Sequence, residues 1–155
     1  MSGSVLISPN ELSALTSLGG VVLIDTRAPE AYAAGHLPGA VNIHDIFTYL
    51  ATSTPEGVAA MREKFAAVFG AAGLSGAETA VVYEQSMNTG FGQSCRGYVL
   101  LSYLGYPKIK ILHGGYAGWV AADLPAAERP KVEVLDETGT AFKALVEKTR
   151  AARGA

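Results

Sequence analysis

Short apolar runs alternate with amphipathic segments along most of this chain. The runs predict strands over residues 5–7, 21–25, 40–43, 79–83 and 109–112, because apolar residues dominate each run and Gly, Pro or polar residues bound it. The runs at 21–25, 40–43 and 79–83 are typical of buried strands. Apolar residues at helical spacing predict a long amphipathic helix over 56–72 and shorter helices ending near 18 and over 29–34, 95–104 and 115–120. This alternation predicts an α/β domain with a mainly parallel sheet.

The ends of the first helix are marked by local signals. Ser8 and Glu11 have the spacing of a capping box, and Pro9 stands between them at the first helical position. The pair Gly19-Gly20 is expected to stop this helix.

The tail of the chain departs from the alternating pattern, so we divide the chain into a domain over 1–130 and an extension over 131–155. Residues 131–135 are typical of a linker or a short strand, and residues 140–152 predict a helix with Phe142, Leu145 and Val146 on one side. Two placements of this helix remain open. It packs on its own domain, or it docks on another domain or on a second subunit, as in a homodimer.

Composition narrows the class of protein. The chain has 155 residues, of which 49% are hydrophobic and 17% charged, enough for the core of one folded domain. The formal net charge of -2 gives no basic footprint for nucleic acid. No signal peptide or membrane span is recognised, and one cysteine allows no intrachain disulfide and no cysteine-rich metal site. A reducing compartment, the cytoplasm, is therefore expected.

Candidate chemistry lies at the carboxyl ends of the strands, where ligands bind in parallel α/β sheets. Three loops meet this condition, those after Asp25, Tyr83 and Leu112. The loop after Tyr83 is the longest and leads into a helix, whose N-terminal N–H groups favour an anion. Gln93 or Ser94 is expected to cap this helix.

The single cysteine, Cys95, falls in the first turn of that helix. There the helix dipole and the adjacent Arg96 favour a thiolate, which makes Cys95 a candidate nucleophile. The alternative is an inert buried thiol, because free cysteines are commonly buried and Cys95 shares a helix face with Val99, which we expect in the core.

Other chemistries find little support in the sequence. A phosphatase of the C-x5-R type needs Arg at the position of Leu101. His36, His44 and His113 are candidate partners for Cys95, but no spacing brings one of them near it. No cluster of His, Cys and carboxylates has the spacing of a metal site.

Two motifs give the chain a family resemblance. LIDTRAPEAYAAGHLPGAVNI (23–43) and YLGYPKIKILHGGYAGW (103–119), followed by Leu124-Pro125, resemble the opening and closing signatures of rhodanese-like domains over residues 5–128. The resemblance implies a five-stranded parallel sheet with helices on both faces. It also implies sulfur transfer, in which a cysteine takes sulfur from thiosulfate or mercaptopyruvate, becomes a persulfide and passes the sulfur to a thiol acceptor. No metal or organic cofactor is implied.

The chain departs from active relatives at the central strand. In active relatives the catalytic cysteine directly follows the central strand, whereas in this chain Glu84 is the residue that follows it. In this respect the chain resembles the non-catalytic first domain of two-domain sulfurtransferases, in which an acidic residue follows the strand and a Ser-Arg pair begins the helix. Here Cys95-Arg96 stands at the position of that Ser-Arg pair. Two hypotheses follow: a displaced nucleophile at Cys95, or a silent module that binds or regulates a partner.

The displaced-nucleophile hypothesis names a set of substrate-binding residues. They are Asn88, Thr89, Gly90, Gly92, Ser94 and Arg96, which are expected to hold the anionic donor and stabilise the departing sulfite. Asp25, Arg27 and His36 of the opening signature are expected to hold the fold together. Glu30 is expected to pair with Arg27, because Ala31 stands where the family commonly has Glu.

Overall fold

A five-stranded parallel sheet organises the computed structural model, which describes residues 4–49, 52–87, 92–127 and 140–153. The strands are β1 (Leu6–Ile7), β2 (Val21–Asp25), β3 (Val41–Asn42), β4 (Thr79–Tyr83) and β5 (Ile109–Leu112), and their order in the sheet is β1-β5-β4-β2-β3. The predicted fold class is confirmed. The central strands β2 and β4 run in register from Val21 beside Thr79 to Asp25 beside Tyr83, so both end at the same level of the sheet.

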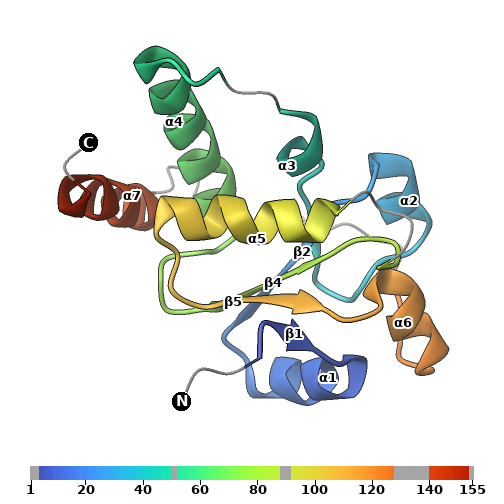
Figure 1. Cartoon of the computed structure of the whole chain (residues 1–155). Coiled ribbons are helices and arrows are strands. Elements are labelled where there is room, and N and C mark those ends of the chain that lie inside the picture. The colour runs from blue at the N-terminus through green and yellow to red at the C-terminus, as the bar shows by residue number, and fades with distance from the viewer. Residues whose placement is uncertain (1–3, 50–51, 88–91, 128–139, 154–155) are drawn as a thin grey trace.

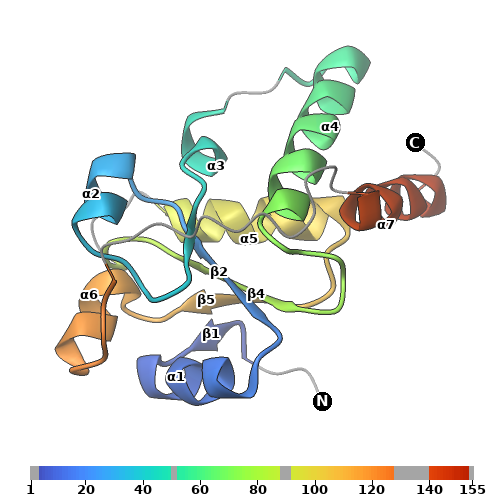
Figure 2. The same ribbon diagram turned by 180° about the vertical axis from the view of Figure 1, so that it is seen from behind.

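Helices cover both faces of the sheet (Figures 1 and 2). One face carries α1 (Pro9–Leu18), α2 (Pro29–Ala34) and α6 (Gly115–Ala121). The other carries α3 (Asp45–Thr48), α4 (Pro55–Ala71), α5 (Gln93–Leu104) and α7 (Thr140–Ala152). The sequence did not predict α3, because a four-residue helix is too short to show a helical period. Among the described residues, no helix is long and apolar enough to cross a membrane.

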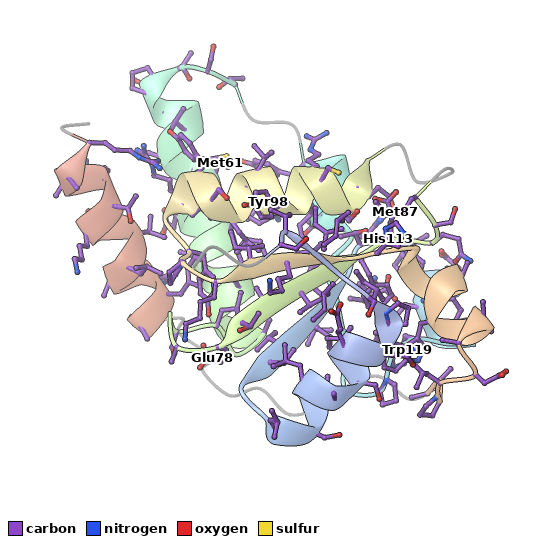
Figure 3. All side chains as sticks on the ribbon, turned by 60° about the horizontal axis from the view of Figure 1, so that its bottom comes forward. Met61, Glu78, Met87, Tyr98, His113 and Trp119 are labelled. Carbon is purple, nitrogen blue, oxygen red and sulfur yellow. The ribbon has the colours of Figure 1, made fainter. Side chains whose placement is uncertain are left out.

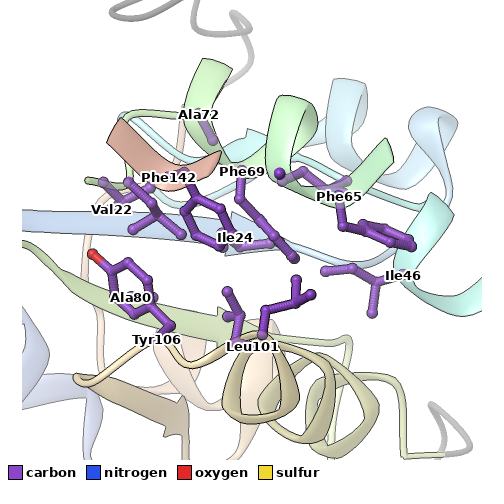
Figure 4. Packing of buried hydrophobic residues seen from close by; sticks show 14 of the residues in the cluster. Val22, Ile24, Ile46, Phe65, Phe69, Ala72, Ala80, Leu101, Tyr106 and Phe142 are labelled. Carbon is purple, nitrogen blue, oxygen red and sulfur yellow. The ribbon is translucent and has the colours of Figure 1, made fainter. Parts of the chain in front are cut away.

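The C-terminal helix α7 belongs to the core of the domain. Its Phe142 and Val146 are buried, and the Phe142 ring lies 5.5 Å from the ring of Phe69 and 5.6 Å from that of Tyr106 (Figure 4). Of the two placements left open by the sequence, this is packing on its own domain. The expected linker or strand over 131–135 lies outside the described residues.

Helix α1 begins with the predicted capping box. Ser8 N–H donates to Glu11 Oε2 at 2.9 Å, and Glu11 N–H donates to Ser8 Oγ at 3.2 Å. The helix ends at Gly19, whose φ of 80° lies in the left-handed region that glycine accepts readily.

Candidate functional site at the carboxyl edge of the sheet

The ends of β2 and β4 are joined by a buried hydrogen bond between side chains. The Tyr83 hydroxyl donates to Asp25 Oδ2 at 2.8 Å and accepts the N–H of Leu37 at 3.1 Å. Burial first, and then the neighbouring Asp25 carboxylate, raise the pKa of Tyr83 far above that of a free phenol. The phenol therefore stays protonated and serves as a fixed donor to Asp25.

Arg27 links this pair to the rest of the edge. Its Nη2 lies 2.7 Å from Asp25 Oδ2 and donates to the Gly35 carbonyl oxygen at 2.6 Å, while Nη1 donates to Gln85 Oε1 at 3.0 Å. The guanidinium also stacks 4.1 Å from the centre of the Tyr116 ring. Burial opposes the charge, but hydrogen bonds to Asp25 and its charge raise the pKa of Arg27. Through these contacts the Arg27 guanidinium connects β2, the end of α2, the loop after β4 and α6.

The expected pairing of Glu30 with Arg27 is wrong. Glu30 is exposed near the start of α2, and the carboxylate that contacts Arg27 is that of Asp25. Asp25 stands two residues before Arg27, close enough for Arg27 to fold back onto it with Nε 3.1 Å from both carboxylate oxygens.

Two of the histidines contact backbone carbonyls. His36 is buried, its Nδ1 lies 2.7 Å from the Tyr32 carbonyl oxygen, and its ring stacks on that of Tyr32 at 3.8 Å. His44 Nδ1 lies 2.9 Å from the Thr26 carbonyl oxygen. His113 is exposed after β5, and Figure 3 shows it with Met87 toward the end of the sheet where α6 begins.

Glu84, directly after β4, caps the N-terminus of α5. Its buried carboxylate accepts the N–H of Ser94 at 2.8 Å, and the Ser94 hydroxyl donates to the same oxygen. A carboxylate is favoured there because the first N–H groups of a helix lack partners and carry the positive end of the dipole. The predicted capping by Gln93 or Ser94 is wrong, since Gly92 is the N-cap residue and the cap comes from Glu84, across the loop. The sequence signal that could have revealed this cap was an acidic residue directly after a strand and shortly before the start of a helix.

The backbone beside Glu84 is held by a second helix N-terminus. Tyr116 N–H donates to the Glu84 carbonyl oxygen at 2.8 Å, and Ala117 N–H donates to that of Gln85 at 2.9 Å. Gly115 makes this approach possible, because its φ is 60° and a Cβ there would collide with the Glu84 carbonyl oxygen. The Gly-Gly pair of the closing motif therefore fixes the loop after β4 against α6.

Cys95 lies in the first turn of α5 and is exposed. The expectation that Val99 lies in the core is wrong: Val99 is 64% exposed, because α5 turns Ser94, Gly97, Leu101 and Leu104 toward the sheet instead. The alternative hypothesis expected a buried thiol, and the exposure of Cys95 contradicts that burial.

The predicted substrate-binding residues fall into two groups. Asn88, Thr89 and Gly90 lie outside the described residues. Gly92, Ser94 and Arg96 gather at the start of α5, but Ser94 is hydrogen bonded to Glu84, and the exposed Arg96 donates from Nη2 to the Tyr49 carbonyl oxygen at 3.0 Å. In the described ranges, no group of three or more His, Cys, Asp or Glu residues is placed to hold a metal ion.

The fold and this edge define a parallel α/β domain whose candidate chemistry lies between a central strand and a helix N-terminus. The family model of the rhodanese-like domain matches residues 8–122. The chain therefore belongs to the rhodanese-like domain family.

Curated relatives carry sulfurtransferase names. A protein of Synechococcus elongatus provisionally named thiosulfate sulfurtransferase is 38% identical over 115 residues, covering 68% of this chain and 33% of the relative. The thiosulfate sulfurtransferase of Azotobacter vinelandii is 31% identical over 121 residues, covering 78% of this chain and 44% of the relative. The chain thus spans less than half the length of these two relatives.

Solved structures share the fold. The crystal structure of the 3-mercaptopyruvate sulfotransferase SseA of Escherichia coli matches with a TM-score of 0.69 at 24% identity, over 86% of this chain and 53% of that one. A rhodanese-related protein of Thermoplasma volcanium matches with a TM-score of 0.55 at 19% identity, over 81% of this chain and 100% of that one.

Proposed function

We propose that this domain transfers sulfane sulfur through a persulfide on Cys95. The observation that supports the proposal is the exposure of the chain's single thiol in the first turn of α5, in a family whose relatives are named sulfurtransferases. Glu84 holds the place directly after β4, so Cys95 is the only residue available to carry the sulfur.

The reaction proceeds in two displacements. The Cys95 thiolate attacks the sulfane sulfur of thiosulfate, the sulfur–sulfur bond breaks, and sulfite leaves with the bonding electron pair. An acceptor thiolate then attacks the outer sulfur of the protonated persulfide, takes it, and releases the Cys95 thiolate. With mercaptopyruvate, the bond that breaks is carbon–sulfur, and pyruvate leaves as its enolate.

Residues at the start of α5 have a defined part in this proposal. Arg96 attracts the anionic donor and stabilises the charge of the leaving sulfite. The partners are a small anionic donor and a thiol acceptor. A reducing compartment such as the cytoplasm suits such a domain, because an exposed thiol stays reduced there.

A second candidate, a silent module that binds or regulates a partner, is favoured by one observation. The Glu84 carboxylate already accepts the N–H and hydroxyl of Ser94, next to Cys95. A buried negative charge at this helix N-terminus repels thiosulfate. It also occupies the Ser94 N–H, a hydrogen-bond donor that a bound anion would need. In this hypothesis the carboxylate replaces the substrate anion permanently.

The experiment that separates the two candidates is sulfur loading. The protein is incubated with thiosulfate, intact mass is measured, and thiocyanate is assayed after addition of cyanide, in wild type, Cys95→Ser and Glu84→Gln. The enzyme proposal expects one added sulfur atom in wild type, none in Cys95→Ser, and faster loading in Glu84→Gln, which keeps the shape of the side chain but removes its charge. No adduct and no thiocyanate with either thiosulfate or mercaptopyruvate would support the silent module.

A further inference from the structure

An apolar groove opens between α3, α4 and α5, on the solvent side of the larger core cluster. Its volume is about 400 Å³, and Ile46, Met61, Phe65, Val99 and Leu100 are among its apolar lining residues. Figure 3 shows Met61 where α4 approaches α5. The groove is separate from the Glu84–Ser94 contact, but its lining includes Arg96, the neighbour of Cys95 in the chain.

The wall of the groove on α5 exposes large apolar side chains. Val99 is 64% exposed and Tyr103 is 40% exposed, and they stand four residues apart on one helix face. With Arg96 and Leu100 they form a strip about 10 Å long, given a rise of 1.5 Å per residue. The Val99–Tyr103 part of this strip is apolar, and adjoining exposed apolar side chains mark a binding surface more often than a scattered exposed residue does.

Positive charges surround the two tyrosines of the groove. Arg62 donates to the Tyr103 hydroxyl at 3.0 Å, and the guanidinium of Arg153 lies 5.2 Å from the centre of the Tyr103 ring. Lys64 Nζ lies 5.4 Å from the Tyr49 ring.

Little negative charge offsets these cations. Lys64 pairs with Asp45 at 3.2 Å, whereas Arg62, Arg96 and Arg153 form no ion pair with any described carboxylate. Glu63 and Glu147 line the neighbouring cavity between α4 and α7 together with Arg62, and Glu147 pairs with Arg150. In a chain of net charge -2, the groove therefore carries a local excess of positive charge.

We propose that this groove docks an amphipathic segment of a partner protein that presents aliphatic or aromatic side chains together with carboxylates. The apolar floor matches the apolar side chains, and Arg62, Arg96 and Arg153 match the carboxylates. An open strip along a helix suits an amphipathic helix, whose apolar residues recur every three or four positions. Met61 adds a side chain that adapts its shape to a partner.

The docked segment lies beside Cys95, because Arg96 lines one end of the groove. In the enzyme hypothesis the partner is placed to receive sulfur, and in the silent hypothesis the groove is itself the binding function. The inference therefore stands apart from the sulfur chemistry, because Cys95→Ser is expected to abolish sulfur loading and to leave docking unchanged.

The test uses labelled peptides as defined probes and the full chain as receptor. One short peptide has Leu and Phe at helical spacing with Glu elsewhere, a second has Lys in place of Glu, and a third is a scrambled form of the first. Fluorescence anisotropy measures binding. The acidic amphipathic peptide is expected to bind about tenfold more tightly than the other two, a difference of about 1.4 kcal/mol. Its affinity is expected to fall as salt screens the charges.

Variants locate the binding. Val99→Asp and Arg96→Glu are each expected to weaken the acidic peptide about tenfold or more, and Arg96→Glu is expected to favour the basic peptide. Val120→Asp is the matched control, because Val120 is 47% exposed on α6, on the opposite face of the sheet.

Several outcomes overturn the proposal. These are equal binding of all three peptides, binding that Val99→Asp leaves intact, and no binding of any peptide. Binding of dodecanoate without binding of the acidic peptide would assign the groove to small amphiphiles instead. Self-association of the chain that Val99→Asp abolishes, again without peptide binding, would assign it to a second copy.

Discussion

The Glu84 carboxylate and Ser94 connect the end of β4 to the start of α5 through two hydrogen bonds to a single carboxylate oxygen. Both residues are buried, so neither bond is exchanged easily for one to water. This contact fixes α5, and with it Cys95, Arg96 and one wall of the apolar groove, relative to the sheet.

Replacing Glu84 by Gln is expected to lower the free energy of unfolding by about 1–3 kcal/mol, because hydrogen bonds to a charged group are stronger and the new amide NH2 group is buried and needs an acceptor. Urea unfolding followed by circular dichroism measures the change. Glu63→Gln, at an exposed position of α4, is the control and is expected to stay within about 0.5 kcal/mol of wild type. A Glu84→Gln variant as stable as that control would show that the contact adds nothing to stability.

Alkaline pH is expected to destabilise the domain through Tyr83. The pKa of Tyr83 is raised in the folded state, so the unfolded chain releases this proton first and binds fewer protons than the native state. The stabilisation is present below the ordinary tyrosine pKa of about 10 and is lost above it, by about 1.4 kcal/mol per pH unit.

Comparison with Tyr83→Phe isolates this effect, because Phe cannot titrate. The variant starts less stable, since Asp25 loses one of its hydrogen-bond donors and the Leu37 N–H loses its acceptor. Its unfolding free energy, measured by urea at several pH values between neutral and about 11, should fall less steeply above the ordinary tyrosine pKa of about 10 than that of wild type. Equal slopes would contradict the raised pKa.

The C-terminal helix is expected to contribute strongly to stability. Phe142→Ala should cost about 3–5 kcal/mol, because it leaves a cavity beside Phe69 and Tyr106 in the core. Lys143→Ala, at an exposed position of the same helix, is the control, and differential scanning calorimetry measures both. A small loss for Phe142→Ala would mean that α7 is only loosely attached.

The sequence predicted the strands well because each buried run is short, apolar and bounded by turn residues, and the two motifs then identified the family. It failed where a residue acts across the chain. Local spacing suggested that Ser94 caps α5, but the cap is Glu84, ten residues earlier. It also assigned Val99 to the core, because several faces of α5 carry apolar residues and periodicity alone does not say which one meets the sheet.

Replacing Gly115, the first residue of α6, by alanine is expected to cost more stability than replacing the turn glycine Gly39. The Gly115 φ of 60° is unfavourable for any side chain, and a Cβ there would also collide with the Glu84 carbonyl oxygen, which accepts the Tyr116 N–H. Gly39 is a matched control, since its φ of 81° carries the same backbone penalty while a Cβ there meets nothing within 4 Å.

Gly39→Ala should therefore cost only about 1–2 kcal/mol, the penalty of a left-handed residue. Gly115→Ala should cost clearly more, because α6 has to move away from the loop after β4 and the bonds from Tyr116 and Ala117 weaken. Urea unfolding measures the loss of unfolding free energy in both variants. Hydrogen exchange at the Tyr116 and Ala117 amides shows whether the loss in Gly115→Ala arises at the start of α6. Equal losses, with protection of these two amides unchanged, would show that the loop accommodates the methyl group without releasing α6.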